Sequence, residues 1–297
     1  MQHLRTDLLD IAYEIGGPDD GPALILLHGW PDDIRAWHKV APRLHEAGFR
    51  TITPYLRGCG PTQFLSETTI RDGRGVALAQ DVIDLADGLG LKHFGVVGHD
   101  WGARAAYFLA SLFPDRVSWI AALALPYQPN GTFTVPPFAQ ARRFWYQWFM
   151  CVEGGAEAVR RDPKSFARIQ WDTWSPPGWF EEDDFDETAR SFENPDWVAI
   201  TLHGYRSRYL REVSDPRYDT LQDRLRTMDR ITVPTLIIQG AVDACNPPEL
   251  SEGQERYFAA GYSRLVLDNT GHFPSREAPD RTATAIVSHF HGSWNQA

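Results

Sequence analysis

Cysteine is scarce in this chain of 297 residues. Its three cysteines, Cys59, Cys151 and Cys245, lie far apart and form no C-x-x-C pair. Disulfide frameworks and cysteine-based zinc sites need several cysteines at short spacing, so we expect neither. Free thiols suit a reducing compartment, and we therefore expect a cytoplasmic protein.

Long apolar runs and clustered basic residues are also lacking. No apolar run approaches the roughly 20 residues that a membrane-spanning helix needs, and residues 1–10 lack the apolar core of a signal peptide. The formal net charge is −10, and the arginines are scattered along the chain. We expect a small molecule as the partner, with no membrane and no nucleic acid, and a monomer or a homodimer.

The sequence is organised around residues 93–114. Apolar residues 94–97 predict a buried strand, and a helical pattern follows over residues 102–113. Gly98 and Gly102 stand two positions before and two positions after Asp100, which allows a very tight turn between strand and helix. This pattern predicts a nucleophile elbow in which Asp100 takes the place that serine usually occupies.

Apolar strands alternate with amphipathic helices on both sides of this elbow. After a hairpin at 2–16, the predicted strands are residues 23–27, 50–56, 94–97, 117–125, 233–238 and 264–267. The predicted helices are residues 34–44, 78–89 and 102–113, with a closing helix from about residue 281. This alternation predicts an α/β fold, in which a mostly parallel central sheet has helices on both faces.

No apolar strand occurs between residues 127 and 228. This segment holds six of the eleven tryptophans of the chain, and its helix-like parts include the stretches 138–151 and 196–211. We interpret it as a helical cap that is inserted into an α/β core made of residues 1–126 and 229–297.

An acid and a histidine follow the last two predicted strands. Asp243 lies just beyond one strand and His272 just beyond the next. Because the carboxyl ends of parallel strands share one edge of a sheet, we expect both to converge on Asp100. The order of nucleophile, acid and histidine, together with the elbow and the His28-Gly29 turn, resembles the α/β-hydrolase fold over nearly the whole chain.

An aspartate nucleophile indicates attack on saturated carbon, because it is ionised at neutral pH and needs no base. Attack leaves an alkyl ester on Asp100, which water hydrolyses when His272 removes its proton and Asp243 holds the imidazole. The backbone N–H groups of Trp30 and Trp101 would bind the oxyanion of this second step. The substrates that fit are epoxides and alkyl halides, and neither a metal nor an organic cofactor is needed.

Four stretches resemble segments of soluble epoxide hydrolases, namely His28-Gly29-Trp30-Pro31, Gly98-His99-Asp100-Trp101-Gly102, Tyr146-Gln147-Trp148-Phe149 and His203-Gly204-Tyr205-Arg206. The resemblance implies that Tyr146 and Tyr205 donate hydrogen bonds to the epoxide oxygen and that Gln147 is their neighbour in the pocket. We also expect His28 and Phe273 to contribute to substrate binding. The opposing interpretation is that both tyrosines only pack within an aromatic-rich cap.

Two features depart from that family. In the loop after the second parallel strand, Tyr55 and Thr62 replace an aspartate and a serine, and we expect this loop to be structural. Arg104 lies one helical turn after Asp100, where an apolar side chain is expected. Arg104 should either pair with an acid or bind a substrate carboxylate, and the second alternative predicts a polar or acidic substrate.

Arg104 also supports a second hypothesis. Fluoroacetate dehalogenases resemble the chain here, because they place an arginine at the same offset from the nucleophile. They also carry an arginine directly after the nucleophile and a His-Trp pair in the cap, where this chain has Trp101 and Tyr146-Gln147. A haloacid or haloalkane dehalogenase that uses the same three residues is therefore the alternative, and a non-catalytic receptor on the same fold is the third hypothesis.

Overall fold

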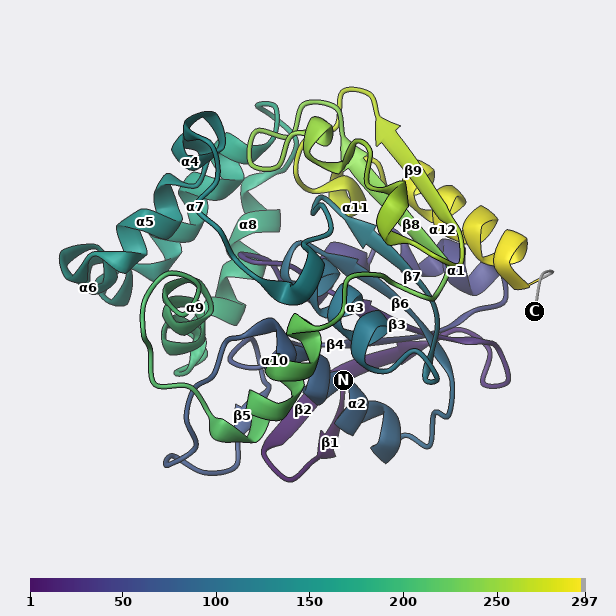
Figure 1. The fold of residues 1–297 in the computed structure, drawn as a ribbon, viewed down its shortest axis with the longest axis horizontal. Helices are drawn as coiled ribbons and strands as arrows, with labels where there is room; N and C mark the ends of the chain where they lie inside the picture. The colour runs from purple at the N-terminus through teal and green to yellow at the C-terminus, as the bar shows by residue number, and fades with distance from the viewer. Residues whose placement is uncertain (295–297) are drawn as a thin grey trace.

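The apolar segments of the sequence form the central sheet. The computed structural model describes residues 1–294, and its strands form one nine-stranded sheet in the order β1-β2-β4-β3-β6-β7-β8-β9, with β5 paired to β2 (Figure 1). The strands are β1 (Gln2–Arg5), β2 (Leu9–Gly16), β3 (Ala23–Leu27), β4 (Arg50–Pro54), β5 (Gln63–Phe64), β6 (Phe94–His99), β7 (Val117–Leu123), β8 (Thr235–Gly240) and β9 (Tyr262–Leu267). β2 is antiparallel to β1, β4 and β5, whereas the ladder from β4 through β3 and β6 to β9 is parallel. The predicted mostly parallel sheet is thereby confirmed.

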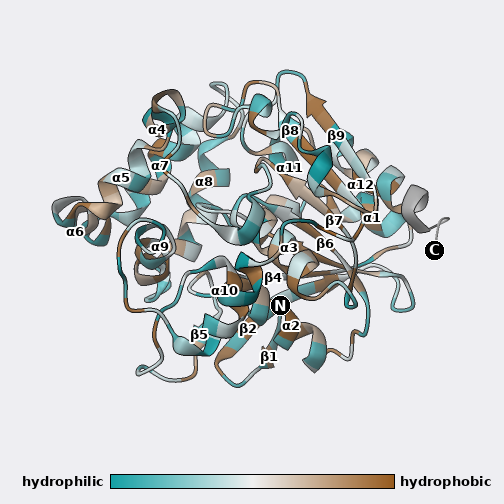
Figure 2. Cartoon of the chain, viewed as in Figure 1, coloured by the Kyte–Doolittle hydropathy of each residue, from teal (hydrophilic) through white to brown (hydrophobic). Residues whose placement is uncertain are grey.

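Helices cover both faces of this sheet. They are α1 (Ala41–Glu46), α2 (Gly75–Gly88), α3 (Trp101–Leu112), α11 (Pro274–Glu277) and α12 (Pro279–Trp294). Along β3, Leu24 and Leu26 join the apolar core under α1 and α12, whereas Ile25 and Leu27 join the core under α2 and α3. Successive side chains of a strand point to opposite faces, so a continuous apolar run such as this one requires cover on both sides. Figure 2 shows the corresponding concentration of hydrophobic residues in the central strands.

Between β7 and β8 the described chain forms helices and no strand. The helices are α4 (Phe138–Arg143), α5 (Trp145–Cys151), α6 (Glu153–Arg161), α7 (Pro163–Trp174), α8 (Glu182–Ala189), α9 (Trp197–Arg206) and α10 (Asp219–Arg226). Figure 1 shows α4 to α9 gathered on one side of the sheet, at the left of the view. We propose that they form the cap within residues 127–228. None of the helices in residues 1–294 combines the length and the apolar character that crossing a membrane requires.

Two helical predictions differ from the structure. The segment 34–44 forms a short 3-10 turn at Ile34–Trp37 and then α1, because Pro42 has no N–H to continue a helix and instead occupies the first turn of α1. The stretch 138–151 divides into α4 and α5 at Phe144, where ψ is 23° and the backbone N–H is shared between two carbonyls of the preceding turn.

Candidate active site

Asp100 stands on a strained turn between β6 and α3. Its φ of 48° and ψ of −106° lie outside the regions that side-chain-bearing residues ordinarily adopt. The two glycines make the turn possible, because a Cβ at Gly98 would lie 2.2 Å from the carbonyl oxygen of Gly102, and one at Gly102 would lie 2.3 Å from that of Leu27. The predicted elbow therefore forms, and Asp100 projects from the carboxyl end of β6.

The predicted acid and histidine meet Asp100 at the same edge of the sheet. The Nδ1 atom of His272 lies 2.8 Å from Oδ2 of Asp243, and its Nε2 atom lies 3.7 Å from Oδ2 of Asp100. The other oxygen of Asp243 accepts the backbone N–H groups of Cys245 and Asn246, each at 2.8 Å. Asp243 is thus held in place and orients His272 towards Asp100.

The charges of these groups shift each other's pKa. Burial alone would lower the pKa of His272, but the carboxylates of Asp243 and Asp100 outweigh burial and raise this pKa to about 10. Burial would raise the pKa of Asp100, but its interaction with the charged ring of His272 lowers it to about 2. At neutral pH the resting site therefore contains an imidazolium between two carboxylates.

One of the two predicted oxyanion donors contacts Asp100. The backbone N–H of Trp30 donates to Oδ1 of Asp100 at 3.0 Å. Trp101 contributes differently in the part of the chain that is described: its backbone N–H makes no hydrogen bond to the Asp100 carboxylate, and its indole Nε1 donates to the Tyr205 hydroxyl at 3.1 Å.

Both predicted tyrosines are buried beside Asp100. Their ring centroids are 5.4 Å apart at an interplanar angle of 87°, and both line a cavity of about 280 Å³ together with Asp100. The Tyr146 hydroxyl accepts a hydrogen bond from Nε2 of Gln147 at 3.0 Å, as the Tyr205 hydroxyl does from Trp101. Burial is the main reason that the pKa of each phenol lies well above its usual value, so both keep their protons.

His28 and Phe273 do not line this cavity. His28 joins two backbone segments, because Nδ1 faces the carbonyl of Gly29 at 2.9 Å and Nε2 accepts the N–H of Leu56 at 3.0 Å. The ring of Phe273 is fully buried and stacks on Trp179 with centroids 4.4 Å apart. The structure thus gives His28 a hydrogen-bonding role between backbone segments and Phe273 a packing role, and neither residue lines the cavity where the sequence suggested substrate contacts.

The loop with Tyr55 and Thr62 is structural, as expected. The Thr62 hydroxyl donates to the carbonyl of Tyr55 at 2.9 Å and accepts the N–H of Ala12 at 3.1 Å, which ties the loop to β2. Arg57 is buried and pairs with Asp81 at 2.6 Å. These contacts give the polar side chains of Arg57 and Thr62 partners within the fold.

Arg104 reaches the cavity and does not pair with an acid among the described residues. Its Nη1 donates to Oε1 of Gln128 at 2.6 Å, and its Nε is buried without a partner. Sequence reasoning did not identify Arg208, which follows α9 and lines the same cavity. It also missed Ser175 at the end of α7, whose Oγ accepts the backbone N–H of His272 at 2.8 Å. The sequence signal for Arg208 was a cation three residues after Tyr205, whereas Ser175 had no signal at all.

Comparison with known proteins identifies the family. Residues 22–279 match the model of the alpha/beta hydrolase fold family, and the chain belongs to this family. The crystal structure of a candidate epoxide hydrolase from Klebsiella pneumoniae subsp. pneumoniae MGH 78578 is similar with a TM-score of 0.90 and 37% identity, covering 97% of this chain and 96% of that one. Epoxide hydrolase A of Mycobacterium tuberculosis is 25% identical, over 93% of this chain and 92% of its own length. An epoxide hydrolase of Caballeronia sordidicola is 26% identical, over 90% and 87% of the two chains. The predicted fold and family are confirmed.

Proposed function

We propose that this protein hydrolyses epoxides to diols through a covalent ester on Asp100. The observation that carries the proposal is the pair of phenols in the wall of the Asp100 cavity. Each phenol oxygen accepts a hydrogen bond from a neighbour, so each keeps its own proton to donate. The Tyr146 hydroxyl also lies 3.7 Å from Sγ of Cys245, a weak hydrogen-bond partner that an epoxide oxygen would replace. An epoxide oxygen becomes a strongly basic alkoxide as the ring opens, so it needs such donors, whereas a departing halide does not.

In the first step an oxygen of Asp100 bonds to a ring carbon while the bond from that carbon to the epoxide oxygen breaks. The epoxide oxygen takes a proton from Tyr146 or Tyr205, and the product is a hydroxyalkyl ester with one tyrosinate. Asp100 performs this attack without a base, because its low pKa keeps it ionised.

The charge coupling at His272 explains how an imidazolium then becomes a base. Alkylation converts Asp100 into a neutral ester, which removes one of the two carboxylates that raise the pKa of His272. The imidazolium then gives its proton to the tyrosinate, directly or through water, and both groups return to neutral forms. The charge of Asp243 remains to hold the imidazole in place.

In the second step neutral His272 takes a proton from water, and the hydroxide attacks the ester carbonyl. The N–H of Trp30, which bonds to Oδ1 of Asp100 in the resting site, stabilises the oxyanion. Collapse releases the diol and restores the Asp100 carboxylate beside the imidazolium. The net reaction adds one water to one epoxide, so atoms and charges balance.

Dehalogenation of a haloacid is the second candidate, and Arg104 is the observation in its favour. Displacement of halide by Asp100 would use the same aspartate and histidine, but it would leave the two phenols without a role. The receptor hypothesis is less favoured. Binding alone requires neither the strained turn at Asp100 nor the charge coupling of His272 to Asp100 and Asp243.

One assay separates these functions. The purified protein is incubated with styrene oxide, with a haloacid and with a haloalkane, and both diol and free halide are measured. We expect diol only, and its loss in Asp100→Ala. Halide release without diol would support the dehalogenase, and no product from any substrate would support the receptor.

A further inference from the structure

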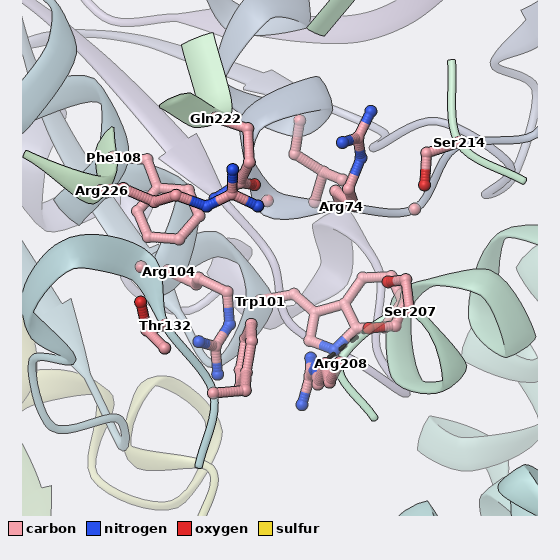
Figure 3. Close-up of a pocket in the computed structure, with 16 residues that line it drawn as sticks. Arg74, Trp101, Arg104, Phe108, Thr132, Ser207, Arg208, Ser214, Gln222 and Arg226 are labelled. Atoms are coloured by element: carbon pink, nitrogen blue, oxygen red, sulfur yellow. Dashed lines mark hydrogen bonds between the residues drawn. The ribbon is translucent and has the colours of Figure 1, made fainter. Parts of the chain in front are cut away.

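Arg104 and Arg208 flank one aromatic ring in the wall of the Asp100 cavity. Their guanidinium carbons lie 4.5 Å and 4.7 Å from the centroid of Phe133. Arg104 lies in α3, the helix that begins at the elbow. Arg208 follows α9, which is one of the helices inserted between β7 and β8. Both also line a second cavity of about 320 Å³, where Figure 3 shows the two side chains near Trp101.

Neither guanidinium has an acid partner within residues 1–294. Arg104 contacts Gln128, and Arg208 donates to the carbonyl of Gly204 at 2.9 Å and to Oε1 of Gln147 at 3.4 Å. Other arginines of the second cavity differ, since Arg74 pairs with Asp72 at 2.7 Å and Arg226 pairs with Asp223. Among the residues that the structure describes, Asp100 is the only acid in the lining of the first cavity, and none lines the second.

This arrangement carries an unbalanced positive charge at a buried place. The Arg104 side chain belongs to a residue that is only 8% exposed, and burial followed by the charge of Arg208 lowers its pKa to about 9. A guanidinium stays protonated in practice, so the pair persists as two cations that repel each other. An anion bound beside these guanidinium groups in the cavity would offset their repulsion.

The two side chains are also held in place before any ligand binds. The ring of Phe133 lies against both guanidinium groups, and the guanidinium carbon of Arg208 also lies 4.3 Å from the ring centroid of Tyr205. Both cations therefore pack on aromatic faces. Gln128 fixes one end of Arg104 at 2.6 Å. An anion therefore need not order two long flexible side chains, which would otherwise weaken binding.

We infer that Arg104 and Arg208 together bind a carboxylate of the substrate, so that the natural substrate class is small epoxides that bear an acid group. That the substrate is an epoxide rests on the proposed function, whereas the anion site does not depend on it. Each guanidinium group supplies a pair of parallel N–H donors that matches the geometry of a carboxylate. A cavity of about 280 Å³ that also holds Asp100 and both phenols limits the substrate to a small molecule.

The first experiment measures binding without any reaction. Cinnamate and cinnamamide have the same skeleton and no epoxide, and differ in one negative charge. By calorimetry we expect cinnamate to bind about 10- to 100-fold more tightly, with Arg104→Met and Arg208→Met each losing most of that preference and the double variant losing all of it. Arg226→Met is the matched control, because it removes a paired, exposed cation of the second cavity and should leave the preference intact.

The second experiment uses 3-phenylglycidate and its primary amide, which are epoxides that differ only in charge. In wild-type protein we expect a KM about 10- to 100-fold lower for the acid with similar kcat, and equal KM values in the double variant. Because Arg208 also lies against Tyr205, equal slowing of both substrates in Arg208→Met would assign it to the phenol and overturn its place in the anion site. Arg104→Gln is measured beside Arg104→Met, and thermal melts identify variants that lose the fold.

The outcomes separate the anion site from the hydrolase. Equal affinity of wild-type protein for cinnamate and cinnamamide would overturn the anion site, whatever the turnover. Selective cinnamate binding that depends on both arginines, with no diol from either glycidate, would support the anion site and refute the epoxide hydrolase.

Discussion

Removing the Tyr205 hydroxyl tests the proposed ring opening most directly. Tyr205→Phe keeps the ring, whose centroid lies 5.3 Å from that of Trp101 and 5.4 Å from that of Tyr146. In wild type the hydroxyl accepts a hydrogen bond from Trp101 and can give its own proton to the epoxide oxygen. The substitution removes this proton donor and leaves the packing of the ring unchanged. Loss of one such donor to a developing oxyanion slows the chemical step by about 10²- to 10³-fold.

The structure also bounds the effect on stability. In Tyr205→Phe the indole Nε1 of Trp101 loses its acceptor, and in Tyr146→Phe the same happens to Nε2 of Gln147. An unsatisfied buried donor costs about 1–3 kcal/mol, so both variants should fold and melt several degrees below wild type. A far larger loss in alkylation rate therefore cannot come from partial unfolding.

The assay is a single-turnover measurement of alkylation, with enzyme in excess over styrene oxide and rapid quenching. We expect both single variants to alkylate slowly and the double variant to be nearly inactive on epoxides. Tyr127→Phe, which removes another phenol from the lining of the same cavity, is the control and should alkylate as wild type does. Because burial raises the pKa of both Tyr146 and Tyr205 well above its usual value, wild-type alkylation should show no loss from deprotonation of tyrosine between pH 7 and pH 9.

Two results would refute this reasoning. Single variants that alkylate at the wild-type rate would return both tyrosines to a packing role. Halide release that survives the double change would transfer the function to the dehalogenase hypothesis, since halide departs without a proton.

Asp100→Asn should abolish turnover at neutral pH, and His272→Gln should leave an alkyl ester on Asp100 that intact mass detects; normal turnover by the His272 variant would exclude the covalent cycle. Asp243→Asn should slow ester hydrolysis more than alkylation, because Asp243 orients His272 and supports its charge, and equal slowing in single-turnover kinetics would contradict that role. Exhaustive chelation should leave activity unchanged, whereas loss that zinc restores would show a metal requirement. Ester hydrolysis needs neutral His272, so it should fall about tenfold per pH unit below the pKa of His272 in the alkylated enzyme. Alkylation should persist to lower pH, because the pKa of Asp100 is only about 2.

The convergence of Asp100, Asp243 and His272 was predictable because topology decides it. Alternation of strand and helix requires parallel strands, and residues that follow parallel strands meet at one edge whatever their separation in sequence. The structure bears this out, since His272 lies 2.8 Å from Asp243 and 3.7 Å from Asp100. The elbow itself was predictable, because only glycine tolerates the backbone contacts at Gly98 and Gly102.

The direction of a side chain was not predictable from its place in a motif. His28 and Phe273 adjoin functional residues in sequence, yet the ring of His28 bonds to backbone at Leu56 and that of Phe273 stacks on Trp179. Trp101 likewise contributes its indole to Tyr205, whereas the sequence drew attention to its backbone. These details depend on which neighbour lies within a few ångströms, and strand and helix periodicity carries no such information.

The proposed anion site was likewise not predictable from the sequence alone. Sequence places Arg104 one turn after Asp100, but only the fold brings to it Gln128 and Phe133 from the connection after β7 and Arg208 from the segment after α9. A shortage of acids does not explain why the two arginines lack a carboxylate partner, since the chain has 39 acidic residues against 29 lysines and arginines. The missing acid is therefore a local property of the cavity wall. A wall that keeps the buried Arg104 and the partly buried Arg208 without an acid partner beside a nucleophile is what an acidic substrate would require, because a resident carboxylate would compete with the substrate for the same donors.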